Sequence, residues 1–200
     1  TYIVTFTDNN NCLDTESVKI TVNNLPVVDA GTNTSICIGD TIQIGGSPTG
    51  PAGSGFFWSP NTTISSTVVA NPDVFPASTI TYYVTVTDVN TCEKNDSIKI
   101  TVFNLPIVSA GNDTSICIGN SVSIGGSPTS ATGISFSWSP SGTLNNPTLT
   151  NPTATPVSNT TYIVTVTDGN SCMNSDTVDV SLFSAVTAVA SNETSICPDD

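Results

Sequence analysis

The sequence predicts an all-β chain built from tandem β-sandwich domains. Short stretches in which apolar residues alternate with Thr and Ser are typical of strands that bury one face. Turn-forming Gly, Pro, Asn and Asp residues separate these stretches. The phrase T-Y-x-V-T-x-T-D occurs three times and is followed each time by a cysteine, at Cys12, Cys92 and Cys172, which are spaced 80 residues apart. A unit of this length fits a small sandwich domain better than one turn of a solenoid.

The 80-residue period divides the chain into four parts. Residues 1–24 read as the last strands of one repeat, 25–104 and 105–184 as two complete repeats, and 185–200 as the first strand of another. Because the sequence starts inside a predicted strand, we expect its natural N-terminus to lie elsewhere. The junctions before 25–104 and 105–184 are short and contain Leu-Pro, and proline stiffens a linker. We therefore expect the domains to follow one another head to tail as a semi-rigid rod.

Within the first complete repeat the strands can be placed in chain order. We predict a first strand over 27–30 that continues through 34–37, a second over 41–45 and a third over 56–58. A short strand near 67–70 precedes two longer ones at 81–87 and 97–102. In the preceding repeat the matching last strand is expected over 17–22.

Alternation assigns the inward side chains. We predict that the core is formed by Phe56, Trp58, Tyr82, Val84, Val86, Ile98, Ile100 and Val102. Phe57 is expected to point outward, because the next repeat has Ser137 there and keeps Phe136 and Trp138.

Seven short strands, with Trp on the third and Tyr on the sixth, are typical of an immunoglobulin-like sandwich. The phrases SICIGD, FFWSP and TYYVTVTDVNTC resemble the PKD-like and Ig-like repeats of very large secreted proteins of Bacteroidota. The resemblance covers the whole chain and implies a cell-surface adhesin, of the kind found among gliding-motility adhesins and other type IX secretion substrates. One departure is that Trp58 is followed by Ser59-Pro60, where standard PKD domains have a W-D-F-G-D-G-like motif.

Six cysteines form two series with the same spacing. Cys12, Cys92 and Cys172 follow the T-Y-x-V-T-x-T-D phrase, and Cys37, Cys117 and Cys197 follow Ser-Ile. Without His or a C-x-x-C pair, zinc is disfavoured. The even, periodic set indicates structural disulfides and hence an oxidising compartment.

Two disulfide patterns remain open. A bond within a repeat would join Cys37 to Cys92 and Cys117 to Cys172, but in a regular sandwich these lie at opposite ends. A strand of about seven residues spans roughly 23 Å, whereas a disulfide needs Cα atoms within about 7 Å. We therefore predict an inter-repeat bond between Cys37 and Cys172. On that pattern Cys12, Cys92, Cys117 and Cys197 would bond to repeats beyond the printed sequence. Free or intermolecular thiols are the third alternative.

Charge restricts the partners. The chain has 3 basic and 16 acidic residues and no His, for a formal net charge of -13. Nucleic-acid binding requires basic side chains, and an anionic membrane surface would repel this protein. No apolar run approaches the roughly 20 residues that span a bilayer. The partners we expect are neighbouring repeats and other copies in a filament.

No residue set predicts catalysis. A Ser-His-Asp triad is excluded by the absence of His. Asp8, Asp88 and Asp168 are weak Ca²⁺ candidates, because calcium prefers oxygen ligands, but Asp and Asn are also favoured in hairpin turns. No other cofactor is expected.

The family resemblance also implies sites of O-glycosylation. Thr41, Ser97 and Thr177 each follow Asp and precede an apolar residue, as in the pattern that Bacteroidota modify. Chance matches are frequent in a chain so rich in Ser and Thr.

These observations lead to three hypotheses of function. The first is a non-catalytic stalk of an extracellular adhesin or surface filament. The second is a glycan- or protein-binding module that uses the loops over 46–55 and 126–133. The third is a set of accessory spacer domains for a secreted enzyme.

Overall fold

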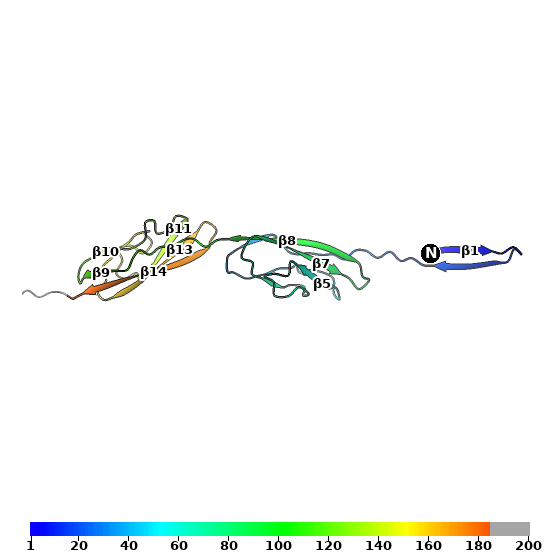
Figure 1. The fold of residues 1–200 in the computed structure, drawn as a ribbon, viewed down its shortest axis with the longest axis horizontal. Coiled ribbons are helices and arrows are strands. Elements are labelled where there is room, and N and C mark those ends of the chain that lie inside the picture. The colour runs from blue at the N-terminus through cyan, green and yellow to red at the C-terminus, as the bar shows by residue number, and fades with distance from the viewer. Residues whose placement is uncertain (185–200) are drawn as a thin grey trace, which may run out of the picture. The chain divides into compact units, whose positions relative to one another are not determined.

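The computed structural model describes residues 1–184, which form strands and no helices (Figure 1). The chain divides into two compact units, Thr1–Phe103 and Asn104–Asp200. The first unit contains the strands β1 (Tyr2–Thr7), β2 (Leu13–Val18), β3 (Thr34–Cys37), β4 (Ile42–Gln43), β5 (Gly55–Ser59), β6 (Asp73–Val74), β7 (Ile80–Thr87) and β8 (Glu93–Phe103). The second contains β9 (Thr114–Cys117), β10 (Val122–Ser123), β11 (Gly133–Ser139), β12 (Thr153–Ala154), β13 (Thr160–Asp168) and β14 (Met173–Phe183).

Each complete repeat is a sandwich of a four-stranded and a two-stranded sheet. In the first repeat the large sheet has the order β3-β8-β7-β5, and β4 pairs with β6 in the small one. The second repeat copies this arrangement with β9-β14-β13-β11 and β10-β12. One buried cluster joins the two sheets, because Ile44 and Val74 pack with Trp58, Tyr82 and Ile100. The predicted all-β, tandem immunoglobulin-like sandwich is confirmed.

The inward side chains follow the predicted alternation. Trp58, Tyr82, Val84, Val86 and Ile100 are fully buried, and Ile98 is nearly so. Phe57 is 57% exposed, which confirms that it points outward. Phe56 and Val102 are partly buried and pack against the core.

Two of the predicted strands are absent, because other partners take their backbone groups. Residues 27–30 form no strand; instead Asp29 N donates to Thr49 O and Ala30 N to the Asp96 carboxylate. Residues 67–70 form no strand either, and Trp58 N donates to Thr67 O. The strand of that region is β6, further along the chain.

Three strand lengths also differ from the prediction. The expected strand over 41–45 is reduced to β4. Ile44 N still donates to Pro72 O, but Pro72 has no N–H to donate in return, and Gly45 has a φ of 105°. The strand expected over 97–102 extends to 93–103, because β8 pairs with β7 along its first part and with β3 along its last. In the preceding repeat the strand is β2, Leu13–Val18, rather than 17–22.

Candidate functional site: the cysteines and the repeated scaffold

The two cysteines of a repeat lie at opposite ends of its longest strand. Cys37 is the last residue of β3 and is level with Phe103, the last residue of β8. Cys92 directly precedes Glu93, the first residue of β8. The 11 residues of β8 cover about 36 Å at about 3.3 Å per residue, far beyond the roughly 7 Å that a disulfide permits. The parallel strands β9 and β14 place Cys117 and Cys172 in the same way.

The cysteines differ in their bonding. Cys37 and Cys172 are disulfide-bonded. Cys12, Cys92 and Cys117 are free thiols, so the structure forms neither Cys37–Cys92 nor Cys117–Cys172. Cys197 lies outside the described residues.

A tight turn fixes the position of Cys92. The Asp88 carboxylate accepts hydrogen bonds from the backbone N–H groups of Asn90 at 2.8 Å and Cys92 at 2.9 Å. Asp88 N donates to Cys92 O at 3.0 Å, and Thr91 adopts a positive φ of 65°. Asp favours such turns because its side chain bonds to the backbone just after it.

The same turn occurs in all three copies. Asp8 and Asp168 accept the matching pairs of N–H bonds, and Asn11 and Ser171 have positive φ like Thr91. The three Asp side chains that were considered as Ca²⁺ ligands therefore accept backbone hydrogen bonds that close these turns. Among residues 1–184 no group of three or more Cys, Asp or Glu side chains is arranged to hold a metal ion.

Cys37 is also held by a turn. Its N–H donates to the Asp40 carboxylate at 3.2 Å, and Asp40 N donates back to Cys37 O at 3.0 Å. Ile38 N donates to Phe103 O at 2.8 Å, which continues the pairing with β8 for one more residue. Cys37 is therefore fixed relative to the end of β8.

The three candidate glycosylation residues are exposed. Thr41 lies just before β4, Ser97 on the outer face of β8 and Thr177 on that of β14. The Asp that precedes Ser97 has a separate role, since the Asp96 carboxylate accepts the N–H of Ala30 at 2.8 Å. Asp176 binds Ala110 with the same distance. The Asp–Ser/Thr pattern on these strands thus has an explanation in the fold.

Sequence reasoning missed this role of Asp96 and Asp176. The available signal was their position, 80 residues apart and in phase with the inward residues of β8 and β14. An acid on the buried side of a strand requires a hydrogen-bond partner. The backbone N–H of Ala30 or Ala110 is that partner.

The side-chain hydrogen bonds around the core join equivalent atoms in the two repeats. Trp58 Nε1 donates to Val69 O at 2.9 Å, and Trp138 Nε1 donates to Leu149 O at 3.0 Å. The Tyr82 hydroxyl bonds to Thr63 Oγ1, as the Tyr162 hydroxyl does to Thr143 Oγ1. Thr49 and Thr129 are buried and donate to Ala70 O and Thr150 O. These bonds join the large sheet and the loops into one scaffold in each repeat.

The loops that sequence offered as a binding surface are partly fixed to the core. In the loop over 46–55, Thr49 is only 1% exposed, and a Cβ added to Gly50 would lie 2.8 Å from Val86 Cγ1. The exposed residues of the loop are 47–48, 51–53 and 55, on either side of these anchored positions.

Comparisons with known proteins give distant structural likenesses. No protein-family model matches the chain, and no curated protein matches its sequence. It is similar to an I-band fragment of titin, with 13% identity and a TM-score of 0.41 over 82% of this chain and 67% of that one. It is also similar to the first two immunoglobulin domains of DIP-gamma, with 11% identity and a TM-score of 0.37 over 80% of this chain and 98% of that one. Extracellular domains 3–5 of Drosophila OTK give 12% identity and a TM-score of 0.36 over 90% and 70% of the two chains. Because these TM-scores are low, the fold is assigned from the sheet topology of this chain and not from the comparisons.

In the described part of the chain, no helix has the length and apolar character needed to cross a bilayer.

Proposed function

We propose that this chain is a stretch of structural spacer repeats from an extracellular surface protein, with a mechanical rather than a catalytic role. The resemblance to PKD-like and Ig-like adhesin repeats supports this proposal. The acidic surface supports it as well, because a net charge of -13 keeps an array soluble and disfavours self-association.

The observation that carries the proposal is that the two repeats share their inward-facing side chains and hydrogen bonds but differ in the side chains on the outer face. The hydrogen bonds of the inward-facing Trp, Tyr and Asp side chains recur with equivalent partners 80 residues later. On the outer face of the large sheet, Phe57 and Tyr83 are replaced by Ser137 and Ile163, and Lys99 is replaced by Asp179. A binding site copied in every unit would preserve its exposed side chains. A spacer needs to preserve only its fold.

The cysteines supply the second element of the proposal, an inter-repeat disulfide between Cys37 and Cys172. Support comes from the two bonded residues, from the free thiols of Cys92 and Cys117, and from the length of β8. Applied along an array, this pattern joins the end of one repeat's β8-type strand to the Asp-closed turn of the next repeat. Disulfides of this kind contribute roughly 2–4 kcal/mol each and persist in oxidising compartments, which fits a location outside the cell.

Small-angle X-ray scattering on arrays of increasing length tests the spacer role. We would extend the chain by two, four and six further 80-residue repeats and measure the maximum dimension under oxidising conditions. A spacer predicts a constant increment of about 36 Å or more for each repeat, the length of the 11-residue strand β8. The matched control is the array with every Cys37-type residue changed to Ser, which should show a smaller increment. A dimension that grows with about the square root of the number of repeats would contradict the proposal, because that is the behaviour of a flexible chain.

A further inference from the structure

Three exposed side chains of the first complete repeat share one face of its large sheet. Phe57 is 57% exposed, Tyr83 is 54% exposed, and Lys99 is exposed as well. They come from β5, β7 and β8, which are neighbours in the sheet order β3-β8-β7-β5. All three alternate with inward-facing residues, so they point away from the core. The outer face of this sheet therefore combines two aromatic rings with a positive charge.

The strand register places these side chains on one diagonal line. Tyr83 lies opposite Ser59, which is two residues after Phe57 on β5. It also lies opposite Ser97, which is two residues before Lys99 on β8. Phe57 and Lys99 are therefore one diagonal step from Tyr83, in opposite directions along β7. Each step measures about 7–8 Å, so the line from Phe57 to Lys99 covers about 15 Å.

A hollow on the same face continues this line. On the neighbouring strand β3, Ser35 lies opposite Thr101, two residues after Lys99. Asn33 Oδ1 accepts the backbone N–H of Lys99 at 2.8 Å, which holds this side chain beside the lysine. The hollow has a volume of about 470 Å³ and is lined by Asn33, Thr34, Ser35, Thr101 and Phe103. The name outer stripe is used below for Phe57, Tyr83, Lys99 and this hollow together.

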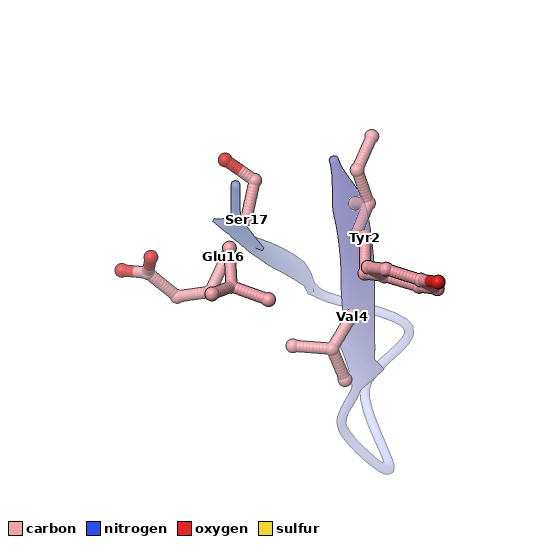
Figure 2. A pocket seen from close by; sticks show the side chains of 6 residues that line it. Tyr2, Val4, Glu16 and Ser17 are labelled. Carbon is pink, nitrogen blue, oxygen red and sulfur yellow. The ribbon is translucent and has the colours of Figure 1, made fainter. Parts of the chain in front are cut away.

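The hollow between β1 and β2 is of a different kind (Figure 2). Tyr2 and Val4, two of the residues that line it, correspond by the 80-residue period to Tyr82 and Val84. Because Tyr82 and Val84 are fully buried, these side chains belong to the core face of a repeat, and we assign no binding site to the hollow. The outer stripe lies on the opposite face, which is exposed in a complete repeat.

The sheet does not need the side chains of the outer stripe in order to form. The second repeat has Ser137, Ile163 and Asp179 in their places, and its strands pair in the same register at these positions. Aromatic cross-strand pairs stabilise a sheet modestly, but the second repeat forms without one here. Asp113 stands in place of Asn33 as well, so the second repeat is more acidic along this line. The outer stripe is thus a property of the first repeat that folding leaves unexplained.

Size and charge restrict what the outer stripe can bind. An aromatic side chain buries about 150–250 Å², so the two rings together offer less than about 500 Å². A stable protein interface buries about 800 Å² on each partner. The net charge of -13 disfavours a polyanion such as nucleic acid. These limits favour a neutral ligand whose flat rings match the area of one aromatic side chain.

A neutral polysaccharide meets these conditions. The apolar C–H face of a pyranose ring stacks on an aromatic ring, and Tyr adds a hydroxyl for hydrogen bonding. The Lys99 ammonium has three donors for sugar hydroxyls, and Asn33, Ser35 and Thr101 place further polar groups around the hollow. Because the stripe is straight, it suits an extended chain. A β-1,4-linked glucan is extended and has flat C–H faces on both sides, whereas an α-1,4-linked glucan of the same composition coils.

We propose that the outer stripe of the first repeat binds a neutral β-linked polysaccharide. Sugar rings stack on Phe57 and Tyr83, while Lys99 and the hollow bond to the hydroxyl groups of the adjoining units. The site goes beyond the spacer role, because it belongs to one repeat and is not copied in the next. It makes this repeat a point of contact along the array. The spacer role does not depend on it.

Nuclear magnetic resonance titration of the full chain with cellohexaose, a β-1,4-linked glucan, tests this proposal. With up to about 5 mM sugar, we expect backbone amide shifts at Phe57, Tyr83 and Lys99 with a dissociation constant of about 1 mM. The matched positions Ser137 and Ile163 serve as an internal control and should not shift. Maltohexaose, the α-1,4-linked isomer, should bind at least about tenfold more weakly. Because the ligand is neutral, about 0.5 M salt should leave the affinity unchanged.

Three results would overturn the proposal. The first is the absence of shifts at the outer stripe, and the second is equal binding of the two sugars. The third is a set of shifts centred on the loop over 46–55, because that result would place the contact on the loop instead of the sheet.

Exchanging residues between the repeats gives variants that the other repeat already accommodates. Phe57→Ser and Tyr83→Ile place the residues of the second repeat in the first, and each should weaken cellohexaose binding at least about fivefold. The control is Phe75→Thr, which also introduces the residue of the second repeat. Phe75 is 49% exposed but follows β6, outside the large sheet, so this change should alter the affinity by less than about twofold. Equal losses in all three variants would contradict the site.

The reverse exchange is an independent check. Ser137→Phe, Ile163→Tyr, Asp179→Lys and Asp113→Asn together rebuild the outer stripe in the second repeat. The amides of β11 and β13 should then shift with cellohexaose as those of β5 and β7 do, with an affinity within about threefold of the first repeat. A second repeat that carries these four changes and still does not bind would contradict the assignment of the site to these side chains.

Discussion

Neighbouring tyrosines show how position on a strand determines the role of a residue. Tyr82 is fully buried and its hydroxyl bonds to Thr63 Oγ1 at 2.7 Å, while Tyr83 is 54% exposed on the opposite face of β7. Thr63 has a positive φ of 57°, so the bond also holds a strained residue of the loop.

The first prediction compares these two tyrosines. Tyr82→Phe should lower the free energy of unfolding by about 1 kcal/mol, because it removes a hydrogen bond and leaves Thr63 Oγ1 with one partner fewer. Tyr83→Phe is the control and should change it by less than about 0.5 kcal/mol. Urea unfolding of the full chain measures both. Equal effects would contradict the assigned role of the Tyr82 hydroxyl.

Asp96 illustrates a polar residue on the buried side of a strand. Asp96→Ala should cost about 1–3 kcal/mol, since it leaves the Ala30 N–H without its acceptor. The exposed Asp73→Ala is the comparison, because the structure gives the Asp73 carboxylate no hydrogen-bond donor among residues 1–184. Thermal unfolding followed by circular dichroism reports the difference. A smaller loss for Asp96→Ala than for Asp73→Ala would refute the role of the Asp96 carboxylate.

At the scale of elements, strands with a clear apolar alternation could be predicted, whereas the place or extent of the two-residue strands could not. The alternation of Tyr82, Val84 and Val86 identifies β7 and its buried face directly. The two-residue strands β4 and β6 give no such signal, and their bounds are set by their pairing with each other in the small sheet. β8 is longer than its apolar pattern suggests, chiefly because residues 93–96 pair with β7 before the apolar alternation begins.

Sequence predicted one part of the candidate site, the separation of the cysteines, but not the other, the role of the turn aspartates. The sandwich topology predicted that Cys37 and Cys92 lie far apart, because it places their turns at opposite ends of a strand. The use of Asp88 to close the turn could not be separated from calcium binding by sequence, since the same residue types serve both. The hydrogen bonds to Asn90 and Cys92 N–H groups define its role in the structure.

Hydrogen exchange should separate two hairpins of nearly the same sequence. An isolated two-stranded hairpin is at best marginally stable in water. At about 10 μM, the amides of β1 and β2 should therefore exchange at least a thousandfold faster than those of β7 and β8. The comparison is internal, because Val4 and Val84 occupy the same position of the repeat. Equal protection of the two hairpins would contradict the exposure of β1–β2.

At the scale of the whole molecule, the proposed inter-repeat disulfide concerns the short junction between two repeats. β8 ends at Phe103, and the carbonyl of Pro106 already accepts a hydrogen bond from Asn174 within the second unit. Two residues therefore separate the last strand of one repeat from the first anchored residue of the next. A disulfide across such a junction would limit the bending that this short linker still allows.

Disulfide mapping of the non-reduced protein tests the proposed inter-repeat disulfide. Trypsin is unsuitable, because Lys19 and Lys94 would leave Cys37 and Cys92 on one peptide. Pepsin at low pH separates them, and protonated thiols do not exchange disulfides. An inter-repeat disulfide should give a peptide pair that joins Cys37 to Cys172 in the non-reduced protein and disappears on reduction. A peptide pair that joins Cys37 to Cys92, or Cys117 to Cys172, would contradict it.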